Sequence, residues 1–373
     1  MAETAQATGA TASETVLSID AMGGDLGPSV VVDGMAKAAE TIGGLRFIVH
    51  GNKRELEALI GRKPILAGRC DLRHADAVVT MDDKPSQVVR SGKGTSMWSA
   101  IESVREGEAT AAISCGNTGA LMAISMVRLR KIEGVNRPAI ACLWPSRNPG
   151  GFNVMLDVGA DIRADENDLL QYALMGASYA RNGFGLSRPR VGLLNVGTEE
   201  FKGRAELKLG SQAIAQSAPA AQFEYVGFVE GGDIPSDRVD VIVTDGFTGN
   251  IALKTGEGTA GLIREFLGQA FRYSILSKIA AVLSMGSMRR LSQRIDPRRV
   301  NGGVFLGLNG TVIKSHGAAD ATGVSAAIKL AFQLAEGGFH ERLAARVASG
   351  IQSSETTPSN GPKDVTSSEA TRP

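Results

Sequence analysis

Short apolar runs recur along this chain, separated by longer stretches in which apolar residues have a helical spacing. Apolar runs of four to six residues bounded by turn-forming residues are typical of buried strands. Seven such runs are Val16–Asp20, Arg46–His50, Ala111–Ser114, Ala139–Trp144, Asn153–Asp157, Val191–Asn195 and Val239–Thr244. The pattern predicts a strand at each of these places.

Helical segments lie between many of the predicted strands. Residues 28–44 begin with Pro28, which favours the first turn of a helix, and end in two glycines. Residues 166–185 carry acidic side chains in their first turn and have Gly183 close behind Arg181. This alternation predicts an α/β protein whose mostly parallel sheet is covered by helices on both faces.

The two ends of the chain lack this alternation. Residues 1–15 are rich in Ala and Thr, and residues 352–373 are rich in Ser, Thr, Pro and charge, with little to bury. We therefore expect a disordered tail at each end. No long linker divides residues 16–351, so we predict a single compound α/β catalytic domain there.

Composition narrows the class of protein. Of 373 residues, 43% are hydrophobic and 21% charged, which is typical of a water-soluble globular chain. The net charge of +1 and the aromatic content of 5% give no basic field or stacking surface, so no nucleic-acid partner is expected. Neither a signal peptide nor an apolar run of about 20 residues is recognisable, and we expect a cytoplasmic protein.

The three cysteines are Cys70, Cys115 and Cys142. They form no CxxC pair and lack the spacing of metal ligands, and a scattered odd set suits a reducing compartment. We expect no metal site and no cofactor.

Glycine-rich polar turns follow four of the predicted strands. These turns are Asp20–Pro28, Cys115–Ala120, Asn195–Gly203 and Asp245–Asn250. Ligands of open parallel sheets bind beyond the carboxyl ends of strands, so we expect the four turns to meet at one edge. Helices starting at Thr118 and near Gly249 would add free N–H groups for an anion. Each turn alone fits an ordinary turn and helix cap equally well.

Charged residues lie in or just after these turns. They are Asp20, Asp25, Glu199, Lys202, Asp245 and Lys254, followed later by Lys314 and His316. Neither GxxxxGK[ST] nor an opening GxGxxG occurs, so the fingerprints of a P-loop and of a dinucleotide site are missing. The aspartates could simply cap turns, His316 could cap a turn, and Lys254 could be a solvated helix residue.

Several of these stretches together resemble one family. They are "DAMGGDLGP", "SCGNTGA", "NRPAIACLWP", "LDVGADIRADENDLLQYALMGASYAR", "RVGLLNVGTEEFKG", "VEGGDIP", "DVIVTDGFTGNIALKTGEG" and "GLNGTVIKSHGAAD". The chain resembles the bacterial phosphate acyltransferases of phospholipid synthesis over about residues 16–338, most specifically over 240–258. Asp161 and Phe228 stand where the family pattern has Asn.

The resemblance implies transfer of a fatty acyl group from acyl-acyl carrier protein to inorganic phosphate, giving acyl phosphate. It also implies a homodimer and a fold similar to phosphate acetyltransferases and isocitrate-dehydrogenase-like proteins. A phosphate oxygen would attack the thioester, so the site must hold phosphate and a developing oxyanion close together.

The turns and the implied reaction together predict the site residues. Phosphate would be bound by Gly116, Asn117, Thr118, Gly119, Gly246, Thr248, Gly249, Asn250, Lys202 and Lys314. Catalytic roles are predicted for Lys254, His316, Asn250 and Asn117, with His316 orienting phosphate or protonating the thiolate. Asp20, Asp25 and Asp245 would orient these donors, because a carboxylate repels phosphate.

Residues 259–299 have a different character. Apolar residues recur there at helical spacing, with eight basic and two acidic residues, so we predict a protruding amphipathic helical segment. It could pack in a dimer, dock an acidic carrier protein or lie on an anionic membrane. The candidate membrane or carrier contacts are Arg272, Leu276, Lys278, Leu283, Arg289 and Arg290.

Two other functions remain open. A metal- and NAD(P)-dependent dehydrogenase of the isocitrate-dehydrogenase-like fold would need an acidic metal cluster, whereas the aspartates here are scattered over separate turns. A non-catalytic protein that docks carrier protein would explain the basic segment but not four ligand-type turns.

Overall fold

The computed structural model describes residues 14–295, 302–339 and 342–345. The two predicted tails therefore lie outside the described residues, apart from Glu14 and Thr15. Thr15 already belongs to the first strand, so the ordered core begins one residue earlier than the pattern predicted.

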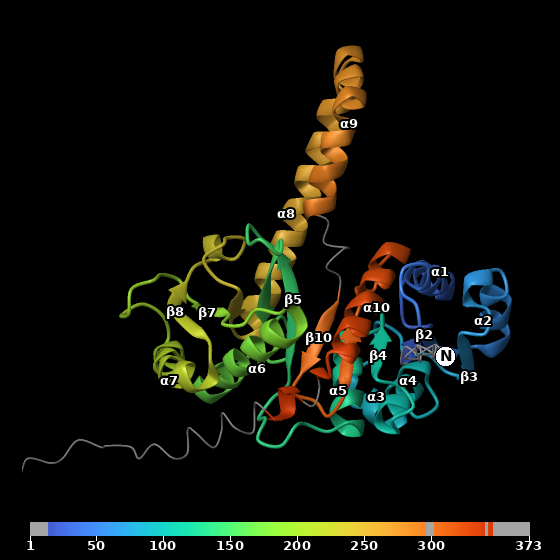
Figure 1. Cartoon of the computed structure of the whole chain (residues 1–373), viewed down its shortest axis with the longest axis horizontal. Coiled ribbons are helices and arrows are strands. Elements are labelled where there is room, and N and C mark those ends of the chain that lie inside the picture. Colours follow the sequence, from blue (N-terminus) through green and yellow to red (C-terminus); the bar gives the residue numbers. More distant parts are fainter. Residues whose placement is uncertain (1–13, 296–301, 340–341, 346–373) are drawn as a thin grey trace, which may run out of the picture.

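The described strands form one eleven-stranded sheet in the order β3-β2-β1-β4-β11-β10-β5-β6-β9-β7-β8 (Figure 1). Their bounds are β1 Thr15–Asp20, β2 Leu45–Gly51, β3 Cys70–His74, β4 Ala111–Ser114, β5 Ala139–Pro145, β6 Phe152–Leu156, β7 Arg190–Leu194, β8 Glu224–Val229, β9 Val241–Val243, β10 Gly303–Leu306 and β11 Thr311–Lys314. All seven predicted strands are confirmed. The sequence pattern missed β3 and β8, which lie at the two edges, and the short strands β10 and β11.

Strand direction reverses near the middle of the sheet. Seven of the ten pairings between described strands are parallel, which confirms a mostly parallel sheet. However, β10 is antiparallel to both β11 and β5, and β5 is antiparallel to β6. Strands β1 to β4 and β11 therefore run opposite to β6 to β9. The prediction that all four turns share one edge is wrong, because these reversals divide them between two halves.

Helices cover both faces of the sheet. Their bounds are α1 Pro28–Ala39, α2 Lys53–Ile60, α3 Pro85–Ser91, α4 Ser96–Arg105, α5 Thr118–Arg128, α6 Glu166–Phe184, α7 Ala205–Ala221, α8 Gly246–Arg272, α9 Ile275–Ile295 and α10 Ala321–Glu336. Successive residues of β4 show the two faces. Ile113 joins the core cluster that contains Val324 of α10, whereas Ala112 joins the cluster that contains Ile101 of α4.

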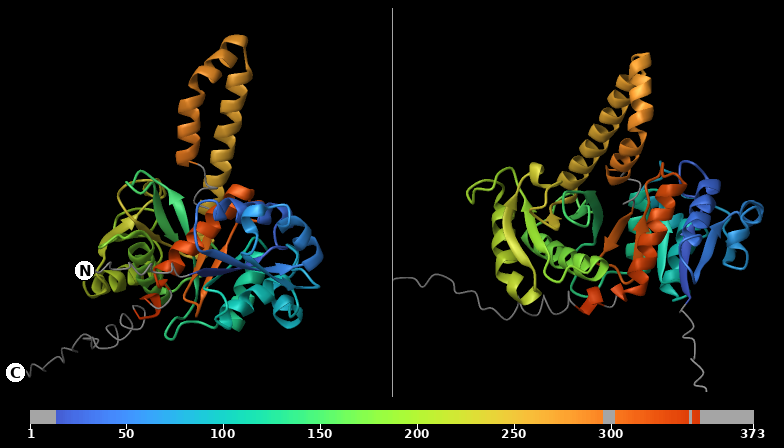
Figure 2. Two further views of the ribbon diagram at one scale, coloured as in Figure 1. Left: turned by 45° about the vertical axis from the view of Figure 1, so that its right-hand side comes forward. Right: turned by 45° about the horizontal axis from the view of Figure 1, so that its top comes forward.

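The helices α8 and α9 project from the body as a hairpin (Figures 1 and 2). At 1.5 Å per residue, the 27 residues of α8 span about 40 Å. Only Gly246 and Gly249, in its first turn, are buried. The predicted amphipathic segment is thus two helices, with Ser274 accepting a hydrogen bond from the N–H of Ser277 at 3.1 Å where α9 begins.

Candidate functional site

A cavity of about 460 Å³ lies where the two halves of the sheet meet, beside β5 and β10. Five residues predicted from the sequence line it: Thr118, Asn250, Lys254, Lys314 and His316. Thr118 follows β4 and Lys314 ends β11, in one half of the sheet. Asn250 and Lys254 belong to α8, which follows β9 in the other half. The cavity therefore gathers polar side chains from both halves although the strands run in opposite directions.

The turn after β4 is held from beneath by a buried carboxylate. Asp20 accepts a hydrogen bond from Ser114 Oγ at 2.6 Å, and Ser114 Oγ accepts one from the N–H of Gly116 at 3.0 Å. Burial raises the pKa of Asp20 above its ordinary value. A Cβ on Gly23 would lie 2.8 Å from the Cα of Gly116, so only glycines allow these two turns to touch. Asp20 has the geometry of an orienting residue.

Asn117 is the N-cap of α5, and its side chain is fully engaged. Its Oδ1 accepts from the N–H of Ala120 at 3.0 Å. Its Nδ2 donates to the carbonyls of Met81 and Asp83 at 2.9 and 3.0 Å. Asn117 is not among the described residues that line the cavity, so the structure favours a positioning role for it over direct contact with a ligand.

The first turn of α5 retains part of the predicted phosphate-binding site. Thr118 and Gly119 are its first two residues, and N–H groups at this place have no partner within the helix. Thr118 lines the cavity. Gly116 offers less than predicted, because its N–H is already donated to Ser114.

The N–H groups at the start of α8 already have partners within the protein. The N–H of Gly246 donates to the carbonyl of Asp161 at 2.7 Å, and that of Gly249 to the carbonyl of Asp245 at 2.9 Å. Thr248 donates both its N–H and its hydroxyl to the Asp245 carboxylate, at 2.8 and 3.1 Å. The structure therefore gives no support to the predicted contacts of Gly246, Thr248 and Gly249 with phosphate, because these donors already have partners.

Asp245 itself is buried and caps α8. Its carboxylate forms an ion pair with Arg204, a residue that the sequence pattern did not single out. Asn250 follows one turn later and lines the cavity. It is a neighbour of Gly159, because a Cβ added to Gly159 would lie 3.8 Å from the Asn250 side chain. Asp245 thus orients the first turn of α8, and Asn250 is its polar contribution to the cavity.

Two lysines reach the cavity in different environments. Lys254 is exposed and pairs with Glu257 at 2.8 Å. Lys314 is largely enclosed, and its ammonium donates to the carbonyls of Cys115, at 3.3 Å, and Ser315. Burial lowers the pKa of Lys314 to about 8, and the nearby charge of Lys254 acts in the same direction. Lys314 is therefore a cation that can be lost slightly above neutral pH.

His316 lies at the mouth of the cavity, exposed, with its Nδ1 accepting the N–H of Ala318 at 3.2 Å. Asp25 is also exposed, and its N–H donates to the carbonyl of Gly317 at 2.9 Å. This contact ties the turn after β1 to the loop that carries His316.

Lys202 lies apart from this group. It pairs with Glu199 at 2.7 Å on the loop after β7, and it is not among the described residues lining the cavity. Its predicted contact with phosphate is not supported, because the turn after β7 is not one of the walls.

Asp157 is a structural centre that the sequence analysis missed. It follows β6 and accepts N–H groups from Ile140 at 2.8 Å, Gly159 at 3.2 Å and Asp161 at 2.7 Å. Burial raises the pKa of Asp157 to about 6. These bonds shape the wall formed by Val158 and Gly159. An aspartate directly before "VGAD" is a sequence signal for such a turn.

The two departures from the family pattern have structural roles. Asp161 is buried and pairs with Arg137 at 2.5 Å, so its negative charge is balanced. Phe228 is buried in the core beside β7. Neither residue is among those that line the cavity.

None of the described helices is long and apolar enough to span a bilayer. No three His, Cys, Asp or Glu side chains among the described residues gather where they could hold a metal ion.

Known proteins similar to this chain share both its sequence and its fold. The model of the family described as "Fatty acid synthesis protein" matches residues 15–342. A protein of Paracoccus denitrificans named phosphate acyltransferase is 75% identical, over 90% of this chain and 91% of its own length. A phosphate acyltransferase of Cereibacter sphaeroides is 69% identical over 95% of both chains.

Solved structures of low identity share the fold. A phosphotransacetylase from Streptococcus pyogenes is 16% identical, with a TM-score of 0.57 over 86% of this chain and 94% of its own. The EutD phosphotransacetylase from Staphylococcus aureus is 13% identical, with a TM-score of 0.53 over 90% and 94%. By sequence, the chain belongs to the fatty acid synthesis family of bacterial phosphate acyltransferases.

Proposed function

We propose that the 460 Å³ cavity is the active site and that it transfers a fatty acyl group from acyl-acyl carrier protein to inorganic phosphate. The observation that carries the proposal is the convergence of Lys254, Lys314, His316, Asn250 and the N-terminus of α5 on one cavity. Two cations and free N–H groups suit a small dianion. The proposed reaction needs no cofactor.

The proposed step forms one bond and breaks one. A phosphate oxygen attacks the thioester carbonyl carbon, and the C–S bond then breaks with its electron pair left on sulfur. The products are acyl phosphate and free carrier protein, whose thiolate takes a proton from His316 or from water. Phosphate dianion is itself the nucleophile, so positioning and charge stabilisation supply most of the rate.

In this proposal some residues bind phosphate and others bind the developing oxyanion of the thioester carbonyl. Lys314, Lys254 and the N–H groups of Thr118 and Gly119 hold phosphate in this proposal. Asn250 and His316 remain for the carbonyl oxygen, where one donor contributes about 3 kcal/mol to the transition state. Asp20, Asp245 and Asn117 position these groups, as their hydrogen bonds indicate.

We infer a second contact surface at the tip of the hairpin. Leu276 is 78% exposed near the tip, and Leu283, about two turns further along α9, is 82% exposed; Arg272 and Lys278 lie in the same region. Arg290 lies about 22 Å further along α9 than Ile275, away from the tip. Exposed apolar side chains among basic ones suit an anionic membrane surface or an acidic carrier protein. The side chain of Arg289 lies outside the described set. A homodimer, which the family resemblance implies, stays a proposal that light scattering in solution would test.

The reaction is tested by trapping its product. Purified protein is mixed with palmitoyl-carrier protein and phosphate, and hydroxylamine converts acyl phosphate into a coloured hydroxamate. We expect hydroxamate that depends on phosphate and is strongly reduced at low phosphate concentration in Lys314→Met. A protein that only docks carrier protein would give none, and that result would overturn the proposal.

The tip is tested separately by liposome flotation. We expect wild type to float with vesicles containing anionic lipid, and Leu276→Glu/Leu283→Glu to remain at the bottom while making hydroxamate at the normal rate. Equal flotation of the two proteins would remove the membrane contact. If the double variant floats like wild type but has a raised KM for the carrier protein, the tip binds the carrier protein instead.

A further inference from the structure

A second cavity, of about 970 Å³, runs along the hairpin between α8 and α9, from Ala252 to Phe271 of α8. It is bounded by α8, by α9 and by the loop around Ile234 and Pro235. One face of α8 lines it at helical spacing, through Gly256, Ala260, Ile263, Leu267 and Phe271. Among the described lining residues only Arg264 is charged, and its stem can lie on apolar surface while its head reaches water. We call this cavity the hairpin groove.

The hairpin groove adjoins the proposed active site. Trp144, Gly256 and Ala260 line both cavities. A Cβ on Gly256 would lie 2.5 Å from the Trp144 indole, so the ring packs directly against the backbone of α8. Trp144 thus lies between the polar cavity with Lys254 and His316 and the apolar hairpin groove.

We propose that the hairpin groove holds the acyl chain of the donor and that α8 determines the chain length accepted. This inference rests on the proposed function, because it places the thioester carbonyl in the polar cavity and its hydrocarbon beyond Trp144. Gly256 and Leu267 are eleven positions apart on α8, which is about 16 Å of helix. One leaflet of a bilayer core, the length of a membrane acyl chain, is about 15 Å thick.

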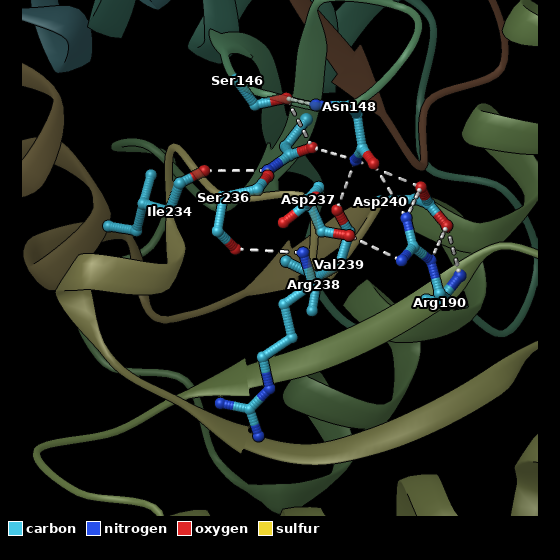
Figure 3. Close-up of polar contacts among 10 residues, drawn as sticks. Ser146, Asn148, Arg190, Ile234, Ser236, Asp237, Arg238, Val239 and Asp240 are labelled. Carbon is cyan, nitrogen blue, oxygen red and sulfur yellow. Dashed lines mark hydrogen bonds and ion pairs between the residues drawn. The ribbon is translucent and has the colours of Figure 1, made fainter.

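A network of polar contacts fixes the outer wall of the groove (Figure 3). Asn153 Nδ2 donates to the carbonyls of Ile234 and Ser236 at 2.8 and 3.0 Å. The N–H of Arg147 donates to the carbonyl of Pro235 at 3.1 Å. Because this loop is tied to the sheet, the groove is preformed and its ligand need not order it.

At its far end the same network includes an ion pair. Asn148 Nδ2 donates to the carbonyl of Val239 at 2.6 Å, and Arg190 forms an ion pair with Asp240 at 2.8 Å (Figure 3). The first bond holds the segment that follows Ile234 and Pro235 against the turn before β6, and the second holds it against β7. This fixed loop therefore forms part of the groove together with α8.

Neighbouring residues on α8 provide a matched test. Ile263 and Leu262 are 51% and 49% exposed, but only Ile263 lines the groove. Ile263→Trp fills it about 10 Å from Gly256, Leu267→Trp fills it about 16 Å away, and Leu262→Trp is the control. The assay is hydroxamate formation with carrier-protein donors carrying 6, 8, 10, 12, 14 and 16 carbons.

We expect Ile263→Trp to lose at least about 50-fold in kcat/KM for the sixteen-carbon donor. That loss corresponds to three methylenes returned to water, at about fourfold each. The six- and eight-carbon donors should stay within about twofold of wild type. Leu267→Trp leaves more of the groove open, so it should reject only the longest of the donors that Ile263→Trp rejects. Leu262→Trp should match wild type at every chain length.

The outcomes separate the two proposals. Wild type inactive with every donor would defeat the proposed function. Wild type active, with the same chain-length profile in all three variants, would defeat the groove alone. A change of oligomeric state in Ile263→Trp and Leu267→Trp without a change of profile would overturn it too, in favour of a second copy covering the groove. Circular dichroism at matched temperature confirms that each variant is folded.

Discussion

The charge of Lys314 gives the most specific kinetic prediction. Lys314→Met keeps the length of the side chain but removes the ammonium from the cavity. A hydrogen bond to a charged group contributes about 1.5–3 kcal/mol, so we expect the KM for phosphate to rise about 10- to 150-fold. The variant should stay folded, because the apolar Met side chain occupies the same enclosed space without a charge to bury.

The pH dependence makes this prediction sharper. Burial lowers the pKa of Lys314 to about 8, so the cation is present below pH 8 and is lost as pH rises through it. From pH 7 to pH 9 the protonated fraction falls about tenfold. The wild-type KM, expressed per phosphate dianion, should therefore rise about tenfold over that range, and in Lys314→Met it should be flat.

Lys254→Met is the matched control for this experiment. Lys254 lines the same cavity but is exposed and paired with Glu257. We expect a higher KM for phosphate with the alkaline rise retained, measured by initial rates at several phosphate concentrations and pH values. If Lys314→Met shows the wild-type rise, Lys314 is not the group that titrates, and the assignment of this lysine to phosphate is wrong.

Two further variants test the positioning residues. Asn117→Asp keeps the oxygen that caps α5 but loses the two hydrogen bonds donated to the carbonyls of Met81 and Asp83. At about 1 kcal/mol per hydrogen bond, kcat/KM should fall at least about tenfold. Full activity in initial-rate assays would count against a positioning role for Asn117. Arg204→Ala leaves the buried Asp245 carboxylate unpaired. Because Arg204 is 56% exposed and water screens the pair, we expect urea unfolding to show a free energy of unfolding lower by only about 1–2 kcal/mol. The double variant Arg204→Ala/Asp245→Asn should recover part of this stability. An unchanged urea midpoint in Arg204→Ala would show that the pair does not stabilise the fold.

Local patterns in the sequence predicted much of the sheet and the starts of α1, α5 and α6, at Pro28, Thr118 and Glu166. Each of the seven strands was marked by an apolar run, and α5 begins at Thr118 as the turn before it indicated. Edge strand β3 was missed because its alternating exposure leaves few apolar residues in a row. Helix α6 runs through Gly183 to a left-handed cap at Gly185, because packing in the core outweighs the low helix propensity of one glycine.

The arrangement of the site depended on long-range pairings. Nothing local to β10 shows that it lies antiparallel between β11 and β5, and this reversal decides which turns meet. Similarly, the N–H of Gly246 is occupied by a carbonyl 85 positions earlier in the chain, that of Asp161. Lysines and the histidine were identifiable by type and by their place after strands, but their partners were not.

The most direct test is the position of the anion. Crystals of the protein would be soaked in arsenate, whose arsenic gives an anomalous signal and which replaces phosphate as an anion of the same shape. We predict one strong anomalous peak within hydrogen-bonding distance of the Lys314 ammonium and the first N–H groups of α5. A peak at the Asn195–Gly203 turn beside Lys202, with this cavity empty, would contradict the account.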